Sequence, residues 1–124
     1  MGKFYFGKEE RLNKKKIIEA LFEKGSSFSV FPLKVFFNSQ PGGGLPHHQV
    51  LITVPIKNFK RAVDRNAIKR RIREGFRLNK TLFQTTSAFS IAYIYIAKEV
   101  LPSPTIHQAI QSSFERLSSY EKKN

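Results

Sequence analysis

The hydrophobic and polar positions of this chain repeat with two different periods, and each change of period marks the boundary of a predicted element. Across residues 13–25 the apolar positions recur every three to four residues, which predicts a helix. Asn13 can cap that helix, and Gly25 can end it in the left-handed conformation. The apolar face of the helix would consist of Ile17, Ile18, Leu21 and Phe22.

Residues 27–38 alternate with a period of two, which predicts extended chain, and Pro32 indicates an edge position or a break. One face would carry Leu33, Val35 and Phe37, and the other Lys34, Phe36 and Asn38. The stretch SQPGGGLPH that follows is rich in residues that resist regular structure. Neither a Lys-Ser/Thr pair nor a helix start follows its glycines, so we interpret it as a flexible hairpin connection and not as a phosphate cradle.

Two further strands and a last helix are predicted in the second half of the chain. Residues 49–55 (QVLITVP) form a β-branched run typical of a buried strand, and residues 87–97 (SAFSIAYIYIA), apolar on both faces, predict a central one. Residues 103–120 predict a helix with Ser103 as its cap and Pro104 at the first helical position, followed by a frayed tail. Its core stripe would be Ile106, Ala109, Ile110, Ser113, Phe114 and Leu117.

The stretch KRAVDRNAIKRRIREGFR, residues 60–77, predicts an amphipathic helix with two adjoining faces. The apolar face would hold Ile68, Ile72, Gly75, Phe76 and Asn79. The basic face would hold Asn66, Lys69, Arg70, Arg73 and Arg77, with Arg65 at the helix start beside Lys69. A third side of Arg71, Glu74 and Leu78 is expected in solvent. Glycine inside a helix is unfavourable by roughly 1 kcal/mol relative to alanine, so the presence of Gly75 indicates that the helix approaches the sheet closely at this position.

The predicted order is helix, three strands, helix, strand, helix. This order favours an α+β sandwich in which helices pack against a small sheet. A chain of 124 residues is one domain by size, and we expect a single domain over residues 1–124, with its core at about 11–117.

The charge of the chain indicates what kind of partner it binds. The net charge is +13, and self-repulsion at that level opposes the compact state, so we expect a polyanionic partner, nucleic acid first. Residues 57–80 alone carry ten Lys or Arg and two acidic residues. A charged helix can also be merely solvated, but such helices usually mix signs. Here only Glu74 can pair, with Arg70 or Arg71, while the basic face repels itself and favours an external anion.

Several classes of function are disfavoured by what the sequence lacks. Without Cys, neither a disulfide framework nor a thiolate zinc site is possible. No apolar run reaches about 18 residues and the first ten residues lack the core of a signal peptide, so we expect a cytoplasmic protein. Asp64 is the only Asp, the eight Glu are scattered, and His47, His48 and His107 have no evident nucleophile beside them. We therefore expect no catalytic side chain and no metal bound by the protein.

The segment AVDRNAIKRRIREGFR resembles the signature of the bacterial ribonuclease P protein subunit, roughly Ala-Val-x-Arg-Asn-Arg-x-Lys-Arg-x-x-Arg-Glu-x-Phe-Arg. Ten specified positions match, and the N-terminal RLNKKKIIEALFEKG and the later strand and helix also fit, so the resemblance covers about residues 11–117. The matching residues are Ala62, Val63, Arg65, Asn66, Lys69, Arg70, Arg73, Glu74, Phe76 and Arg77.

The resemblance implies a ribosomal-protein-S5-domain-2-like fold with a left-handed β-α-β crossover. It also implies a subunit that assists a catalytic RNA with bound Mg²⁺ in removing the 5′ leader of precursor tRNA, an endonucleolytic hydrolysis. No membrane and no further protein partner is expected. RNA contacts are expected from Lys57, Lys60, Arg61, Arg65, Asn66, Lys69, Arg70, Arg73 and Arg77. A cleft beside the first helix would receive the single-stranded leader on Ile18, Phe22, Lys34 and Phe36.

The sequence departs from the family pattern at three places. Ala67 replaces the third residue of Arg-Asn-Arg, and by the helical wheel it points away from the basic face. The segment VPIKNFKRAV differs from the usual Ser-Lys-Lys-x-Gly-Lys, so the turn before the helix is expected to differ. Ile18 and Phe22 stand where the family often has two Phe, which leaves one aromatic surface fewer.

Two other functions fit the charge and are kept as alternatives. A structural ribosomal protein would explain the charge and the fold, but not the motif spacing or an aromatic cleft. A duplex-DNA regulator could place the basic helix in a major groove. The apolar face of that helix is committed to packing, however, and no dimerisation element is evident.

Overall fold

The structure is a computed structural model that describes residues 15–39, 49–80 and 89–123. The element order predicted from the sequence is confirmed. The expected cap Asn13, the Gly-rich loop after residue 39, His47 and His48 lie outside the described residues. The elements are α1 (Lys15–Lys24), β1 (Ser26–Val30), β2 (Leu33–Ser39), β3 (Gln49–Thr53), α2 (Ala62–Asn79), β4 (Phe89–Tyr95) and α3 (Ser103–Lys123).

The four strands form one mixed sheet in the order β1-β2-β4-β3. Both neighbours of β2 are antiparallel to it, whereas β3 and β4 are parallel, as expected for strands joined by a helix. The break expected at Pro32 is a hairpin turn, with a cis peptide bond between Phe31 and Pro32. The central position of β4 is confirmed. The strand β3 lies at the edge, and within it only Gln49 and Val50 are buried, whereas a buried strand was predicted.

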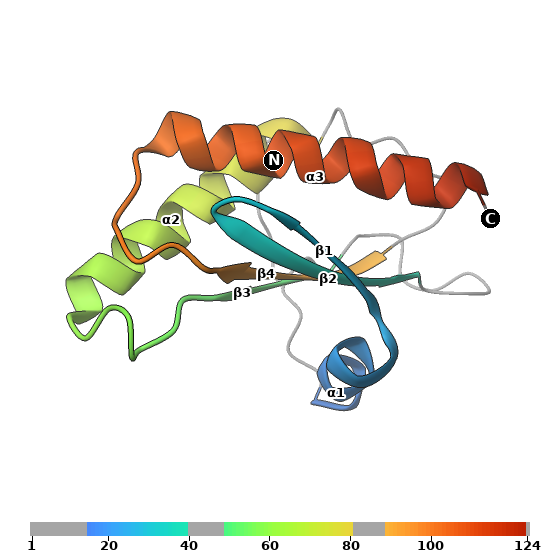
Figure 1. Ribbon diagram of the computed structural model, residues 1–124, viewed down its shortest axis with the longest axis horizontal. Helices are drawn as coiled ribbons and strands as arrows, with labels where there is room; N and C mark the ends of the chain where they lie inside the picture. The colour runs from blue at the N-terminus through green and yellow to red at the C-terminus, as the bar shows by residue number, and fades with distance from the viewer. Residues whose placement is uncertain (1–14, 40–48, 81–88, 124) are drawn as a thin grey trace, which may run out of the picture.

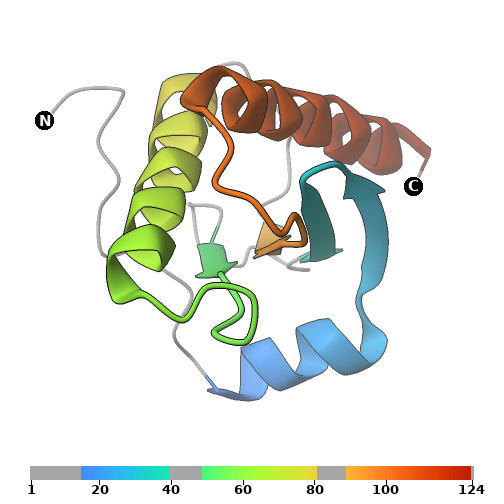
Figure 2. The ribbon, with the colours of Figure 1, turned by 60° about the vertical axis from the view of Figure 1, so that its left-hand side comes forward.

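The crossover through α2 has the left-handed sense that the family resemblance implies. In Figure 1, β3 and β4 both run from right to left, and α2 returns above them in the opposite direction. Figure 2, seen from the left-hand side of that view, places β3 to the left of β4. The chain therefore winds left-handedly from β3 through α2 to β4, against the strong right-handed preference of such units.

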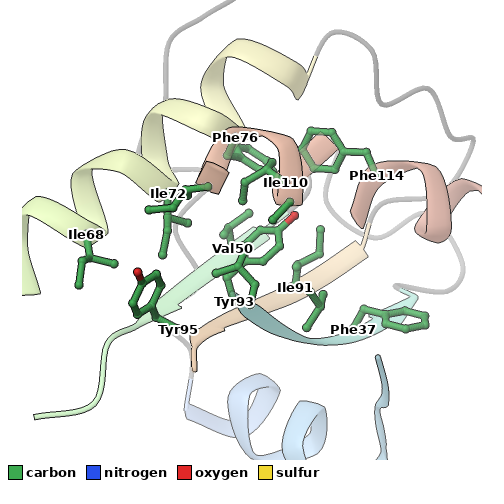
Figure 3. Close-up of a cluster of buried hydrophobic side chains, with 14 of the residues drawn as sticks. Phe37, Val50, Ile68, Ile72, Phe76, Ile91, Tyr93, Tyr95, Ile110 and Phe114 are labelled. Atoms are coloured by element: carbon green, nitrogen blue, oxygen red, sulfur yellow. The ribbon is translucent and has the colours of Figure 1, made fainter. Parts of the chain in front are cut away.

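Helices cover both faces of the sheet, unequally. Figure 1 shows α2 and α3 on one face and α1 on the other. The main core lies under α2 and α3, where strand residues such as Tyr93 and Val50 meet Ile68, Ile72 and Phe114 (Figure 3). A smaller cluster lies under α1. Its fully buried members are Leu21 and Ala92, with Ile17, Ile18, Phe36 and Leu51 packed against them.

The helix α3 differs from its prediction at both ends. Ser103 is already helical, and Ile106 donates its N–H to the carbonyl of Pro102, so the helix starts at the residue that was expected to cap it, and Pro102 takes the cap position. The helix continues to Lys123 where a frayed tail was expected. The ring centroids of Tyr120 and Phe37 are 4.7 Å apart, and this contact holds the last turns of α3 against the sheet. The predicted core stripe is buried throughout.

The surroundings of Gly25 and Gly75 differ from those that the sequence predicted. The φ of Gly25 lies outside the left-handed region, which corrects the predicted helix end; a Cβ there would overlap the carbonyl oxygen of Leu21. Gly75 allows a close approach, but to α3 and not to the sheet. A Cβ at Gly75 would lie 3.0 Å from Cδ2 of His107 and 3.0 Å from Cγ1 of Ile110. Glycine therefore sets the spacing between α2 and α3.

Candidate nucleic-acid interface

The predicted division of α2 into an apolar and a basic side is confirmed. Its buried residues are Ile68, Ile72, Gly75 and Phe76. On the other side, Asn66 and Arg70 are exposed, and Lys69, Arg73 and Arg77 are partly exposed. Asn79 is half-buried, and its side-chain Nδ2 donates to the carbonyl of Gly75 at 2.8 Å. The packing of the apolar side therefore fixes the direction in which the basic side chains project.

Among the described residues, the basic side of α2 meets no acidic side chain that neutralises it. Within residues 15–39, 49–80 and 89–123, Glu74 forms no ion pair with Arg70 or Arg71, although helical spacing would allow one. Arg71 is half-buried, and its Nη1 donates to the carbonyl of Leu101 at 2.8 Å. This bond corrects the expectation that Arg71 lies in solvent, because it ties α2 to the segment before α3. The cations that remain repel one another along the helix.

The segment between β3 and α2 adds three cations beside the start of the helix. Lys57, Lys60 and Arg61 are all exposed. The segment makes a tight turn in which the N–H groups of Asn58 and Phe59 both donate to the carbonyl of Pro55. Phe59 is buried, and its ring centroid lies 5.7 Å from that of Tyr95.

Arg65 differs from the other cations of the motif. It is half-buried, and its Nη1 donates to two backbone carbonyls, that of Phe59 at 2.8 Å and that of Lys60 at 2.9 Å. The structure thus places Arg65 within the predicted interface, but directs part of its guanidinium into the protein. Ala67 is half-exposed, so the missing arginine of the family motif leaves no buried gap.

A second surface lies on the opposite face of the sheet, where α1 packs across β2. The structure brings together all four residues predicted for a leader cleft. The rings of Phe22 and Phe36 meet edge to face with centroids 5.0 Å apart, and Nζ of Lys34 lies 5.2 Å from the centroid of Phe36. Phe22 is 40% exposed, Phe36 is half-exposed, and Ile18 is half-buried beside them. Phe36 is therefore accessible beside α1 and not sealed in the main core.

The strand register adds residues to this surface that the sequence analysis did not name. Lys34 pairs with Ser29 on one side and with Ile94 on the other, and Ile94 pairs with Thr53. These four share one row of the same sheet face and are at least partly accessible. The alternation within each strand shows which residues share a face. Only the pairing of strands shows which of them are neighbours.

The described part of the chain offers few groups for catalysis or for a metal. Across the described ranges, no group of three His, Cys, Asp or Glu residues lies close enough to hold a metal ion. The buried Nε2 of His107 has no hydrogen-bond partner, and the ring packs at Gly75 between α2 and α3. None of the helices described is long and apolar enough to cross a membrane.

Sequence comparison places this arrangement among known proteins. A model of the family described as Ribonuclease P matches residues 6–119. The ribonuclease P protein component of Porphyromonas gingivalis is 33% identical over 120 residues, covering 93% of this chain and 88% of that protein. That of Chlorobium phaeobacteroides is 41% identical over 76 residues, covering 59% of this chain and 52% of that protein.

Solved structures give the same result for the fold. The ribonuclease P protein of Thermotoga maritima superposes with a TM-score of 0.71 at 27% identity, covering 86% of this chain and 96% of that one. A Staphylococcus aureus RNase P protein mutant with defective mRNA degradation activity gives 0.73 at 26% identity, covering 89% of each chain. The similarity thus spans most of the chain.

Proposed function

Because this chain belongs to the ribonuclease P protein family, we propose that it binds the catalytic RNA through α2 and the 5′ leader of precursor tRNA beside α1. Membership makes it a protein component of ribonuclease P, with a part in tRNA processing and an RNA partner in the ribonucleoprotein. The finer proposal is that the complex forms in the cytoplasm without a further protein. There it would assist Mg²⁺-dependent hydrolysis that leaves the mature tRNA 5′ end.

The first half of the proposal rests on the row of cations on α2, which no side chain of the described residues neutralises. Lys69, Arg73 and Arg77 follow one another at helical spacing on its accessible side. Folded RNA offers phosphates and 2′-hydroxyls across a shallow minor groove, and Lys, Arg and Asn side chains can contact both. A phosphate row would replace the repulsion within the helix by attraction. Exposed Asn66 and Arg70 extend the same side.

The second half rests on the aromatic surface beside α1. An unpaired base can stack on Phe22 or Phe36, and such stacking contributes about 1–3 kcal/mol per base with little dependence on sequence. The ammonium of Lys34 lies next to the Phe36 ring, where it can hold the phosphate that adjoins a stacked base. This combination suits a single strand of variable sequence.

The division of labour between protein and RNA follows from the donor groups. Mg²⁺ prefers carboxylate and other oxygen ligands, and the described residues present no cluster of them. The proposal therefore assigns the metal to the RNA. The relatives named above are all ribonuclease P proteins, which favours this function over a ribosomal protein or a duplex-DNA regulator.

The proposal is tested by cleavage of precursor tRNA by a cognate catalytic RNA at low Mg²⁺, with and without the full-length protein. We expect the protein to lower the Mg²⁺ concentration that cleavage requires. In parallel, immobilised protein should retain the catalytic RNA in preference to ribosomal RNA and duplex DNA. Cleavage that is unchanged by the protein, with tighter retention of ribosomal RNA, would favour the ribosomal alternative.

The leader surface is tested by varying the leader itself. Holoenzyme is assembled at saturating protein, and affinity is measured for mature tRNA and for precursors with leaders of increasing length. Wild-type protein should improve affinity over the first several leader nucleotides, and Phe22→Ala and Phe36→Ala should flatten that gain. Phe31→Ala is the matched control, because Phe31 is 68% exposed in the hairpin turn. Equal losses for mature and precursor tRNA in folded variants would show that these rings serve packing only.

A further inference from the structure

Among the described cations of the motif, Arg65 differs in that its guanidinium donates hydrogen bonds to the backbone of the turn before α2. Nη1 carries two hydrogens, and it lies within hydrogen-bond distance of the carbonyls of Phe59 and Lys60. Both hydrogens are therefore directed into the turn between β3 and α2. Lys69, Arg70 and Arg73 have no side-chain hydrogen bond to any of the described residues.

The turn that Arg65 holds carries exposed cations on both sides of its anchor. Its first part is fixed by the two N–H groups that donate to Pro55, and its middle by the buried ring of Phe59. From Phe59 to Arg61 the chain must leave the core and enter the helix. There the Arg65 guanidinium satisfies the Phe59 and Lys60 carbonyls, so that the positions of Lys60 and Arg61 relative to α2 depend on it.

We propose that Arg65 is a positioning residue that holds the turn carrying Lys57, Lys60 and Arg61 in place for RNA, and not itself one of the phosphate contacts. This inference rests on the proposed RNA surface of α2. Ordering a mobile basic segment at the moment of binding opposes association, and a segment that is already held avoids that penalty. Lysine is a poor replacement, because the planar fork of arginine places its donors in a fixed geometry that a single ammonium lacks.

The inference is tested by a double-mutant cycle on affinity for the catalytic RNA, measured with the full-length protein over a range of salt concentrations. Arg65→Ala is made in the wild-type background and in a K57A/K60A/R61A background, and Arg73→Ala is the matched control in both. We expect Arg65→Ala to weaken binding roughly tenfold in the wild type and by much less in the triple variant, where no cations remain to be ordered.

The control should behave differently on both measurements. Arg73→Ala should weaken binding by the same factor in both backgrounds and lower the salt slope by about one unit in each. Arg65→Ala should leave the slope of the triple variant unchanged. Arg65→Lys keeps the charge and the helix propensity, so it should fold, yet it should lose affinity as Arg65→Ala does.

Two outcomes would overturn the inference, and they are distinguishable. If Arg65→Ala weakens binding equally in both backgrounds and lowers both slopes, or if Arg65→Lys retains full affinity, Arg65 is a direct phosphate contact. The α2 surface then stands without the positioning role. If Arg73→Ala and the triple variant both bind the RNA as wild type does, the proposed surface itself is wrong.

Discussion

At Gly75 the absence of a side chain decides how closely two helices approach. The position faces His107 and Ile110 of α3, and Ile110 is fully buried. Glycine is unfavourable in a helix interior by about 1 kcal/mol relative to alanine, and here close packing offsets that loss. The family signature leaves this position unspecified, so its requirement is a property of the packing in this chain.

Gly75→Val is expected to destabilise the protein by about 1–3 kcal/mol, because a branched side chain would enter space already filled by His107 and Ile110. The measurement is the free energy of unfolding from denaturant titration followed by circular dichroism. Arg70→Val, on the exposed side of the same helix, is the control and should change stability by less than about 0.5 kcal/mol. Equal effects of the two substitutions would show that α2 and α3 are not closely packed at this point.

At the scale of one element, α2 joins two roles whose residues alternate along it. Ile68, Ile72 and Phe76 are fully buried, while Lys69 and Arg73, next to the first two, are accessible. Helical geometry turns each neighbour by about 100°, so consecutive residues serve the core and the surface in turn. The two roles should therefore be separable by single substitutions at adjacent positions.

Ile72→Ala is expected to cost about 2–5 kcal/mol of stability through a core cavity, with RNA affinity retained under conditions in which the variant is folded. Arg73→Ala should leave stability within about 0.5 kcal/mol and weaken RNA binding. Thermal unfolding and RNA titration of both variants separate these effects. A lower melting temperature for Arg73→Ala with unchanged RNA affinity would show that the basic side of α2 is only a solvated helix surface.

The contact between β4 and α3 depends on a buried polar pair. The hydroxyl oxygens of Tyr93 and Ser113 are 2.8 Å apart, and Ser113 donates its hydrogen to the carbonyl of Ile110 at 2.6 Å. Tyr93 must therefore be the donor in the pair. Burial raises the pKa of Tyr93 far above its ordinary value, so the phenol stays protonated and able to donate.

Ser113→Ala should cost about 1–3 kcal/mol, because it leaves the buried Tyr93 hydroxyl without a partner. Tyr93→Phe alone should cost less, since Ser113 keeps its bond to Ile110. The double variant should lose less than the sum of the two single variants, and denaturant unfolding of all three measures the difference. Additive losses would mean that the two hydroxyls do not interact.

At the scale of the whole molecule, the sheet separates two surfaces of different chemistry. The helix α2, which carries the basic side, lies on one face of the sheet, and α1, which carries Phe22, lies on the other (Figures 1 and 2). The chain as a whole carries a net charge of +13. The same charge repels itself in the free protein and attracts phosphate in the proposed complex.

Added salt should therefore act in opposite directions on the two states. Between about 50 and 200 mM NaCl, the melting temperature of the free protein should rise as self-repulsion is screened. Over the same range, affinity for the catalytic RNA should fall by roughly a thousandfold if about six phosphates are contacted. Calorimetry and RNA titration provide the two measurements. A melting temperature that falls with salt would indicate that attractive ion pairs dominate the free protein.

Local periodicity by itself determined the elements of this protein and the sides of its helices. The two faces of α2, the buried stripe of α3, the inward set of Leu33, Val35 and Phe37, and the central place of β4 all followed from the sequence. Periods of 3.6 and 2 residues are properties of the backbone, so residue spacing alone reveals which side chains share a face. The spacing of the motif likewise predicted the family.

The tertiary structure decided what spans distant parts of the chain. It placed α3, and not the sheet, against Gly75; it turned Arg71 toward Leu101 and Arg65 toward the preceding turn; and it put β3 at the edge. It also aligned Ser29, Lys34, Ile94 and Thr53 in one row. A periodic pattern states that a side chain faces inward or outward. Which atom it meets depends on how segments far apart in the sequence come together, because packing and strand register are set by all of them at once.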